Sequence, residues 1–212
     1  MKTRFLEVEG FFENPDEIRA TAMGPTFEYW PAETHPDGGN WPGIRSSFIS
    51  AVDQSVFDQI IASFYKTQGW QLSRSVYFES YFQSFQEKDG VSWVHNDVLE
   101  QDFTHVCIVY LTPDAPPSGG TLFYEPKDGL TIDELKLKNE GDIPGAEENY
   151  NVIHDSPNQY NKAVVYLPEE LHKSNVYFGD TFKNSRLIQI SFIRDNEAQS
   201  TDGKRGQTGA LA

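Results

Sequence analysis

The feature that most constrains the fold is a series of short segments, rich in aromatic and β-branched residues, that fills much of the chain after residue 74. Clusters of Gly, Pro and Asp separate these segments, as is typical of strands joined by turns in antiparallel proteins. Strands of this kind bury their apolar faces against a second layer, so we expect an antiparallel sandwich. The expected strands are RSVYFESYFQSFQ (74–86), THVCIVYLT (104–112), GTLFYEP (120–126), KAVVYLP (162–168) and SRLIQISFIRD (185–195).

Two helices are expected ahead of these strands. The segment NPDEIRATAM begins with Asn14, an N-cap candidate, and continues with proline at the first helical position and acids in the first turn. The segment SAVDQSVFDQIIASFYKTQ, residues 50–68, places an apolar residue at every fourth position from Val52 to Phe64. This spacing is typical of an amphipathic helix.

Together these elements predict a mainly β chain with flanking helices, folded as one domain over residues 1–195. The helices would occupy about residues 1–75, and the sandwich core about residues 76–195. A chain of 212 residues is long enough to bury a large core in a single domain. Residues 196–212 are polar and small, without apolar periodicity, and we expect a mobile tail there.

Two segments of mixed composition are expected to be loops. Residues 125–161 combine acids and prolines with one short helix-like run, and long connections of this kind are commonly lids, binding loops or plain excursions. We expect an inserted loop there. Residues 27–48 are rich in aromatic residues, Pro and Gly, which favours a surface loop anchored by Trp30 and Trp41.

Composition limits the partners and the compartment. The chain has 32 acidic and 17 basic residues, a formal charge of -15, so it should repel nucleic acid and anionic membrane surfaces. No run of 18 apolar residues is present, and the start, MKTRFLEVEG, lacks an apolar stretch of signal-peptide length. We expect a soluble, cytoplasmic protein. The single cysteine, Cys107, cannot form an internal disulfide, which agrees with a reducing compartment.

A histidine and an aspartate two positions apart occur twice, as His95 with Asp97 and as His35 with Asp37. On an extended chain such a pair points to one side, so the two side chains could bind one ion. His35 lies in the turn-forming sequence THPDGG, whereas His95 follows VSWV and leads into an expected strand. Because a metal site needs rigid support, we expect His95 and Asp97 to be the metal-binding pair.

A third ligand must come from another part of the chain. His105 lies inside an expected strand, where a structural role is favoured, and His154 lies in the expected loop. His172 follows the apolar segment AVVYLPEEL and precedes the strand that carries Arg186. His172 is therefore the best-placed candidate.

The order of these motifs resembles the Fe(II)/2-oxoglutarate-dependent dioxygenases, and most closely their prolyl-4-hydroxylase-like branch. The resemblance covers about residues 76–194. It implies a double-stranded β-helix, or jelly roll, in which His95, Asp97 and His172 bind one Fe(II) at the open end. The matching motifs are H-x-D (His95, Asp97), C-I-x-Y-L (107–111), Gly-Gly-Thr-Leu (119–122), V-V-Y-L-P-x-x-x-H (164–172) and Arg186 at the head of an apolar strand.

Coordination chemistry is consistent with this ligand set. Two imidazoles and one carboxylate leave three positions vacant, which suits a ferrous ion that must also bind a bidentate cosubstrate and O2. Members of the family convert 2-oxoglutarate to succinate and CO2, and most of them hydroxylate the main substrate. The resemblance thus implies Fe(II), 2-oxoglutarate and O2 as cofactor and cosubstrates.

The cosubstrate needs a cation for its far carboxylate. The planar guanidinium of Arg186 can bind that carboxylate through two parallel hydrogen bonds, and the resemblance implies that Tyr110 assists it. Related hydroxylases tend to have a tyrosine ten residues before the first ligand, where this chain has Phe85. A polar contact near the cosubstrate would then come from Tyr81 or Gln83.

The main substrate is left open as a small molecule or a peptide, and so is the oligomeric state. Arg45, in WPGIRSS, is the candidate residue to face that substrate, with loops 27–48 and 125–161 closing over the site. Two other classes stay open. One is a cupin-like isomerase, lyase or hydrolase that uses Zn(II), Mn(II) or Ni(II) without 2-oxoglutarate, against which Arg186 argues. The other is a non-catalytic binding module.

Overall fold

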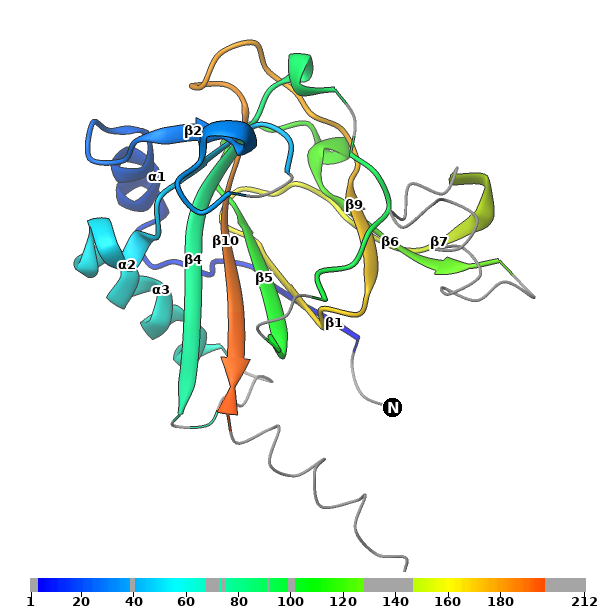
Figure 1. The fold of residues 1–212 in the computed structure, drawn as a ribbon, viewed down its shortest axis with the longest axis horizontal. Coiled ribbons are helices and arrows are strands. Elements are labelled where there is room, and N and C mark those ends of the chain that lie inside the picture. Colours follow the sequence, from blue (N-terminus) through cyan, green and yellow to red (C-terminus); the bar gives the residue numbers. More distant parts are fainter. Residues whose placement is uncertain are drawn as a thin grey trace, which may run out of the picture.

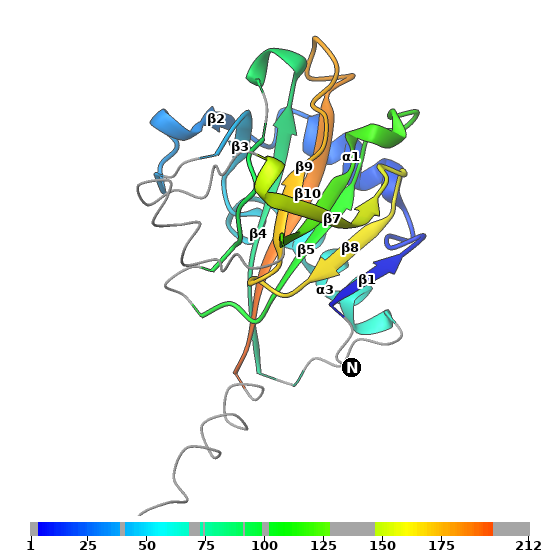
Figure 2. The same ribbon diagram turned by 90° about the vertical axis from the view of Figure 1, so that its right-hand side faces the viewer.

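The computed structural model describes residues 4–38, 41–67, 73, 75–90, 92–98, 102–127 and 147–196. Within these residues, two antiparallel sheets face each other, and the helices cover the outer face of the larger sheet (Figure 1). In Figure 2 the strands of the smaller sheet lie in front of the larger sheet. The expected jelly roll with flanking helices is confirmed.

The larger sheet has seven strands in the order β1-β8-β5-β10-β4-β3-β2. Its centre is the pairing of β10 with β4, which runs along the full length of both strands from Arg186 opposite Phe85 to Asp195 opposite Val76. The strands are β1 (Phe5–Val8), β2 (Tyr29–Pro31), β3 (Ile44–Ser46), β4 (Val76–Phe85), β5 (His105–Tyr110), β8 (Ala163–Tyr166) and β10 (Arg186–Asp195).

The smaller sheet has three strands in the order β7-β6-β9. They are β6 (Thr121–Pro126), β7 (Tyr150–Ser156) and β9 (Leu171–Ser174). An isolated antiparallel bridge between His95 and His172 attaches the segment 92–98 to the free edge of β9. This segment therefore extends the smaller sheet on the side where the candidate metal ligands lie.

The helices are α1 (Pro15–Met23), α2 (Ile49–Val52) and α3 (Gln54–Lys66), and the 3-10 turns are η1 (Ala32–Thr34), η2 (Glu87–Asp89), η3 (Pro117–Gly119) and η4 (Glu147–Asn149). The helix expected over residues 50–68 is divided at Asp53. The Asp53 carboxylate accepts a hydrogen bond from the backbone N–H of Val56 at 3.1 Å and so caps α3. Asn14 precedes α1, but its side chain forms no capping hydrogen bond.

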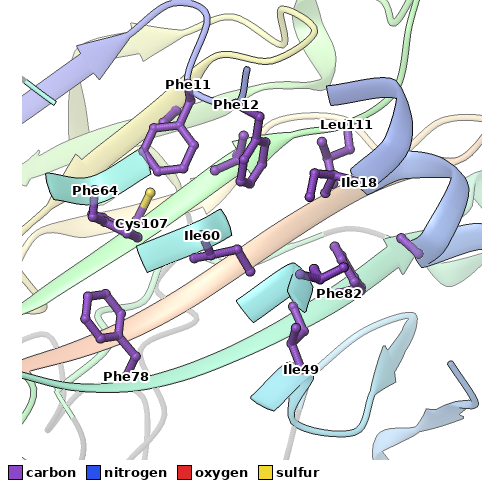
Figure 3. Packing of buried hydrophobic residues seen from close by; sticks show 14 of the residues in the cluster. Phe11, Phe12, Ile18, Ile49, Ile60, Phe64, Phe78, Phe82, Cys107 and Leu111 are labelled. Atoms are coloured by element: carbon purple, nitrogen blue, oxygen red, sulfur yellow. The ribbon is translucent and has the colours of Figure 1, made fainter. Parts of the chain in front are cut away.

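Strand alternation divides the buried side chains into two cores. On β10, Leu187 and Ile193 face the helices, whereas Ile188, Ile190 and Phe192 face the smaller sheet. Cys107 is fully buried in the helix-covered core, and burial raises the pKa of its thiol. Figure 3 shows this outer core, with labels on Phe11, Phe12, Ile18, Ile49, Ile60, Phe64, Phe78, Phe82, Cys107 and Leu111.

The expected boundaries need correction where strands lie in segments expected to be loops. Residues 27–48 contribute β2 and β3, and β1 extends the larger sheet from the N-terminal region, where helices and a loop but no strand were expected. Residues 150–156, expected within the inserted loop, form β7. The remaining loop residues 128–146, and residues 197–212 of the expected tail, lie outside the described residues. Among the described residues, no helix is both long enough and apolar enough to span a bilayer.

Candidate functional site

A cavity of about 600 Å³ lies between the two sheets. The larger sheet contributes inward-facing apolar side chains, among them Ile108, Ile188 and Ile190, and the segment 92–98 contributes polar ones. The cavity is also lined by every site residue proposed from the sequence except Tyr110, namely Arg45, Tyr81, Gln83, His95, Asp97, His172 and Arg186.

His95, Asp97 and His172 offer ligand atoms that all lie within 4.8 Å of one another. The Nε2 atom of His172 is 3.4 Å from one Asp97 carboxylate oxygen, and the Nε2 atom of His95 is 3.9 Å from the other. Backbone hydrogen bonds hold the group together, because His95 and His172 exchange N–H···O bonds of 2.9 and 2.8 Å. Within the described residues, this is the one cluster of His, Cys, Asp and Glu with metal-ligand spacing.

Both imidazoles are oriented by backbone carbonyl groups. The Nδ1 atom of His95 is 2.9 Å from the carbonyl oxygen of Trp93, and that of His172 is 3.0 Å from the carbonyl oxygen of Glu170. A neutral imidazole that donates from Nδ1 leaves Nε2 free to bind a metal. Burial lowers the pKa of His172 to about 4, so this ring is neutral at pH 7. The donor set therefore fits a divalent transition metal such as Fe(II).

Tyr166 is a site residue that sequence reasoning missed. It comes from β8 of the larger sheet, and its hydroxyl lies 2.9 Å from Asp97 Oδ2 and 3.1 Å from His172 Nε2. Burial, followed by the charge of Asp97, raises the pKa of Tyr166, so the phenol keeps its proton. In the sequence this tyrosine stands in the apolar run AVVYLP and reads as a core residue. Its contact with the ligands depends on how the two sheets pack.

Arg186 lies at the end of the cavity next to Gly119 and Gly120. Its side chain is fully buried, its Nε donates to the Gly119 carbonyl oxygen at 2.7 Å, and its Nη2 lies 3.4 Å from both Gly120 O and Thr121 Oγ1. Its Nη1 has no hydrogen-bond partner among the described residues. No Asp or Glu among these residues forms an ion pair with the guanidinium. A guanidinium in this position can accept an anion from the cavity.

Tyr110 lies behind Arg186. Its hydroxyl donates to Thr121 Oγ1 at 2.8 Å, and the Arg186 guanidinium carbon is 5.6 Å from the centre of the Tyr110 ring. Thr121, which the sequence did not single out, lines the cavity between them. Tyr110 is therefore placed to orient Thr121 and to pack against Arg186.

Arg45 enters the cavity from β3, where it is the register partner of Gln83 on β4. Its Nε and Nη2 both donate to the Gln83 side-chain oxygen, at 3.2 and 2.8 Å. The guanidinium carbon lies 5.0 Å from the centre of the Tyr81 ring. Tyr81 and Gln83, the residues expected to contact the cosubstrate, thus both lie beside Arg45. Phe85 packs under Arg186 at 5.1 Å.

The other histidines have separate roles. His35, from the competing H-x-D pair, is buried, with Nε2 3.0 Å from the Ser46 carbonyl oxygen and edge-on contacts to Trp30 and Trp41. It anchors the segment between β2 and β3. His154 lies on β7, with its Nε2 3.1 Å from a Glu7 oxygen.

Comparison with solved structures gives clear likenesses at low sequence identity, although no family model and no curated protein matches the sequence. HygX from Streptomyces hygroscopicus, with nickel and 2-oxoglutarate bound, has a TM-score of 0.60 and 13% identity, over 92% of this chain and 84% of HygX. A Trichoplax adhaerens prolyl hydroxylase, in complex with a hypoxia inducible factor peptide fragment, has a TM-score of 0.54 and 11% identity, over 94% and 87% of the two chains.

A third likeness widens the range of reactions found on this fold. SnoN, a non-heme alpha ketoglutarate dependent epimerase from nogalamycin biosynthesis, has a TM-score of 0.52 and 14% identity, over 98% of this chain and 87% of SnoN. The chain therefore has the jelly-roll fold of a structural class that includes a 2-oxoglutarate-bound protein, a prolyl hydroxylase and an alpha ketoglutarate dependent epimerase.

Proposed function

We propose that this chain is an Fe(II)- and 2-oxoglutarate-dependent oxygenase. His95, Asp97 and His172 would hold the iron, and Arg186 would bind the far carboxylate of 2-oxoglutarate. The observation that carries the proposal is Arg186 itself. It is a fully buried guanidinium with an unpartnered Nη1, and it lines the same cavity as the three candidate ligands.

The argument from Arg186 is electrostatic. A buried charge without a counter-ion is strongly unfavourable, so a guanidinium of this kind is expected to pair with an anion in the working protein. A small dicarboxylate such as 2-oxoglutarate supplies one carboxylate for Arg186 and a second, chelating end for a metal. The two alternative functions, a cupin-like enzyme without 2-oxoglutarate and a binding module without metal, do not include a dicarboxylate that would pair with Arg186.

The residues of the chain have distinct tasks in this reaction. When bound, Fe(II) supplies the O2 chemistry that couples conversion of 2-oxoglutarate into succinate and CO2 to oxidation of the main substrate. Arg186 orients the cosubstrate, and Tyr166 donates a hydrogen bond that fixes the Asp97 carboxylate. Ile108, Ile188 and Ile190 keep the cavity wall apolar, which limits the access of water.

Hydroxylation of a small molecule or peptide is the outcome we propose. The related folds support both substrate kinds, since HygX has been solved with hygromycin B and the Trichoplax adhaerens enzyme with a peptide fragment. Epimerisation is the second candidate, because SnoN shares the fold. Product mass under ¹⁸O2 separates the two outcomes, since only hydroxylation adds an oxygen atom to the product.

A succinate assay tests the proposal. Protein loaded anaerobically with Fe(II) should bind about one iron per chain and, after admission of O2, convert 2-oxoglutarate slowly to succinate even without a main substrate. Asp97→Ala should lose iron and turnover, whereas Asp37→Ala, which changes the competing H-x-D pair, should keep the iron. Iron binding without any 2-oxoglutarate binding would favour the cupin-like reading, and absence of metal would favour a binding module.

A further inference from the structure

We infer that the cavity contains a second anion site, at Arg45, and that the main substrate is a small carboxylic acid with an apolar body. This inference rests on the proposed function, in which 2-oxoglutarate occupies Arg186. It concerns a different guanidinium, on a different strand, with its own geometry.

The Arg45 side chain is held in a defined position. Both of its hydrogen bonds go to one neutral acceptor, the Gln83 side-chain oxygen, while the Gln83 amide nitrogen donates to the Pro42 carbonyl oxygen at 3.1 Å. The guanidinium carbon lies 4.0 Å from the centre of the Trp41 ring and 5.0 Å from that of Tyr81. These contacts fix the plane of the guanidinium and leave its charge without a counter-ion.

Within the described part of the chain, no carboxylate forms an ion pair with Arg45, although the charge of Asp97 acts on it from a longer distance. The acids that line the cavity all lie beyond ion-pair distance from Arg45. Asp97 belongs to the candidate metal site, Asp37 lies 3.7 Å from His35, and Glu79 accepts a hydrogen bond from Tyr77 at 3.0 Å. Burial lowers the pKa of Arg45 to about 10, which still leaves it charged at pH 7. A largely buried, charged and unpaired arginine indicates a site for an anion.

The two arginines reach the cavity from different strands. Arg45 projects from β3 and Arg186 from β10, and β4 lies between these two strands. Neighbouring strands are about 4.8 Å apart, so the two side chains start from strands roughly 10 Å apart. A 2-oxoglutarate that spans Arg186 and the metal would leave Arg45 free. A second anionic group, carried by the main substrate, would then balance the remaining charge.

The surroundings of Arg45 define the rest of the substrate. A planar guanidinium stacked on aromatic rings recognises a carboxylate through two parallel hydrogen bonds better than a point charge does. Phe48, Trp41 and Trp93 line the same cavity and offer apolar contacts to the body of the substrate. A volume of about 600 Å³, shared with the cosubstrate, suits a small molecule.

Trifluoroacetate followed by ¹⁹F NMR is a direct probe of this site. The protein is loaded with Zn(II), which is diamagnetic and inert to O2, and is saturated with 2-oxoglutarate so that Arg186 is occupied. Wild type should bind trifluoroacetate saturably without displacing 2-oxoglutarate, and should bind the neutral trifluoroacetamide much more weakly. Arg45→Gln should weaken trifluoroacetate binding about tenfold or more, and Arg45→Lys less, because lysine keeps the charge without the planar fork.

Arg194→Gln is the matched control, because Arg194 also stacks on an aromatic ring, 5.0 Å from that of Tyr77, but does not line the cavity. It should leave trifluoroacetate binding unchanged. The inference is overturned if wild type shows no saturable signal, if trifluoroacetamide binds equally well, or if binding survives in Arg45→Gln protein that is folded by circular dichroism. Survival in that variant would place the anion on the metal.

The same samples separate this inference from the proposed function. Arg45→Gln should retain 2-oxoglutarate binding far better than Arg186→Ala does. If Arg45→Gln abolishes 2-oxoglutarate binding instead, Arg45 is the cosubstrate anchor and the inference is wrong. If wild type does not bind 2-oxoglutarate at all, the proposed function is wrong. Trifluoroacetate binding to the Zn(II) protein, compared between wild type and Arg45→Gln, then still tests the anion site.

Discussion

At the scale of single residues, Arg186 is a buried charge whose proposed role in binding 2-oxoglutarate can be tested directly. Its guanidinium is 0% exposed, and the side chains on its inward face, Ile188 and Ile190, are apolar. Arg186→Ala should therefore weaken 2-oxoglutarate binding by about 2 to 5 kcal/mol, or roughly 30-fold to several-thousand-fold. The measurement is a titration of anaerobic Fe(II) protein with 2-oxoglutarate.

Two companion variants sharpen this prediction. Iron binding should survive in Arg186→Ala, because the arginine is not a candidate ligand. Tyr110→Phe should have a smaller effect in the same direction, since it removes one neutral hydroxyl beside Arg186 and Thr121 and leaves the guanidinium in place. An unchanged 2-oxoglutarate affinity in folded Arg186→Ala protein would leave the oxygenase proposal resting on the metal ligands alone.

Tyr166 gives a second prediction at this scale. Its hydroxyl is placed to hold Asp97 in the orientation that a metal needs, so Tyr166→Phe should weaken metal binding about 10- to 100-fold. Chelator competition with Co(II) or Zn(II) measures this affinity without turnover. Tyr150→Phe is the matched control, because its buried hydroxyl has no partner among the described residues. Equal metal affinities in the two variants would reduce the Tyr166 hydroxyl to a packing group.

The residues of the site differ in how far the sequence could identify them. His95 and Asp97 could be proposed because their spacing and the strand-like flanks are local signals, and the structure brings both together with His172. Tyr166 could not, because alternation in AVVYLP assigns it to the core equally well. Only the packing of β8 against β9 and the segment 92–98 brings its hydroxyl to two candidate ligands.

At the scale of secondary-structure elements, the edge strand β1 is held by an ionic contact as well as by its pairing with β8. Glu7 accepts hydrogen bonds from Lys162 on the loop before β8 at 3.4 Å and from His154 on β7 at 3.1 Å. The Lys162 side chain is only 3% exposed. Glu7→Gln should therefore destabilise the fold by about 1 kcal/mol, a low value because Glu7 itself is partly solvated.

Urea denaturation measures this difference, and Glu13→Gln provides the control. Glu13 pairs with Lys66 at 3.3 Å, but both side chains are highly exposed, so its loss should have almost no effect. Burial by itself raises the pKa of Glu7, but Ser156, Lys162 and His154, in that order, more than offset this and hold the pKa below its usual value. The stabilisation is thus present above about pH 4.3 and is lost as the pH falls through the lowered pKa. The gap between wild type and Glu7→Gln should close in acid.

The elements that the sequence predicted are those with long or strongly patterned segments. β4, β5, β8 and β10 carry aromatic and β-branched runs, and all of them were expected. β2 and β3 have three residues each, too few for alternation to show. β7, YNVIHDS, is largely polar on its exposed face and adjoins a long segment of loop-like composition. Pairing with β6, which is a non-local interaction, makes it a strand.

At the scale of the whole molecule, the site joins the two sheets. The candidate ligands lie on β9 and the segment 92–98, which belong to the smaller sheet, whereas Arg186 and Arg45 project from the larger sheet. A cosubstrate held by both the metal and Arg186 would cross-link the two layers. Its binding energy would then appear as resistance of the whole domain to unfolding.

This arrangement predicts that Fe(II) and 2-oxoglutarate stabilise the domain together more than the sum of their separate effects. A ligand at a hundred times its dissociation constant adds about 2.7 kcal/mol of stability, which corresponds to a rise of about 5 to 10 °C in Tm for a domain of this size. Thermal denaturation under anaerobic conditions measures the four combinations of metal and cosubstrate. Glutarate, which has the same carbon chain without the 2-oxo group, should give a much smaller shift.

Equal stabilisation by 2-oxoglutarate with and without metal would mean that it binds away from His95, Asp97 and His172. Loss of the shared stabilisation in Arg186→Ala, with the shift from Fe(II) alone retained, is the result expected if the cosubstrate links the two sheets.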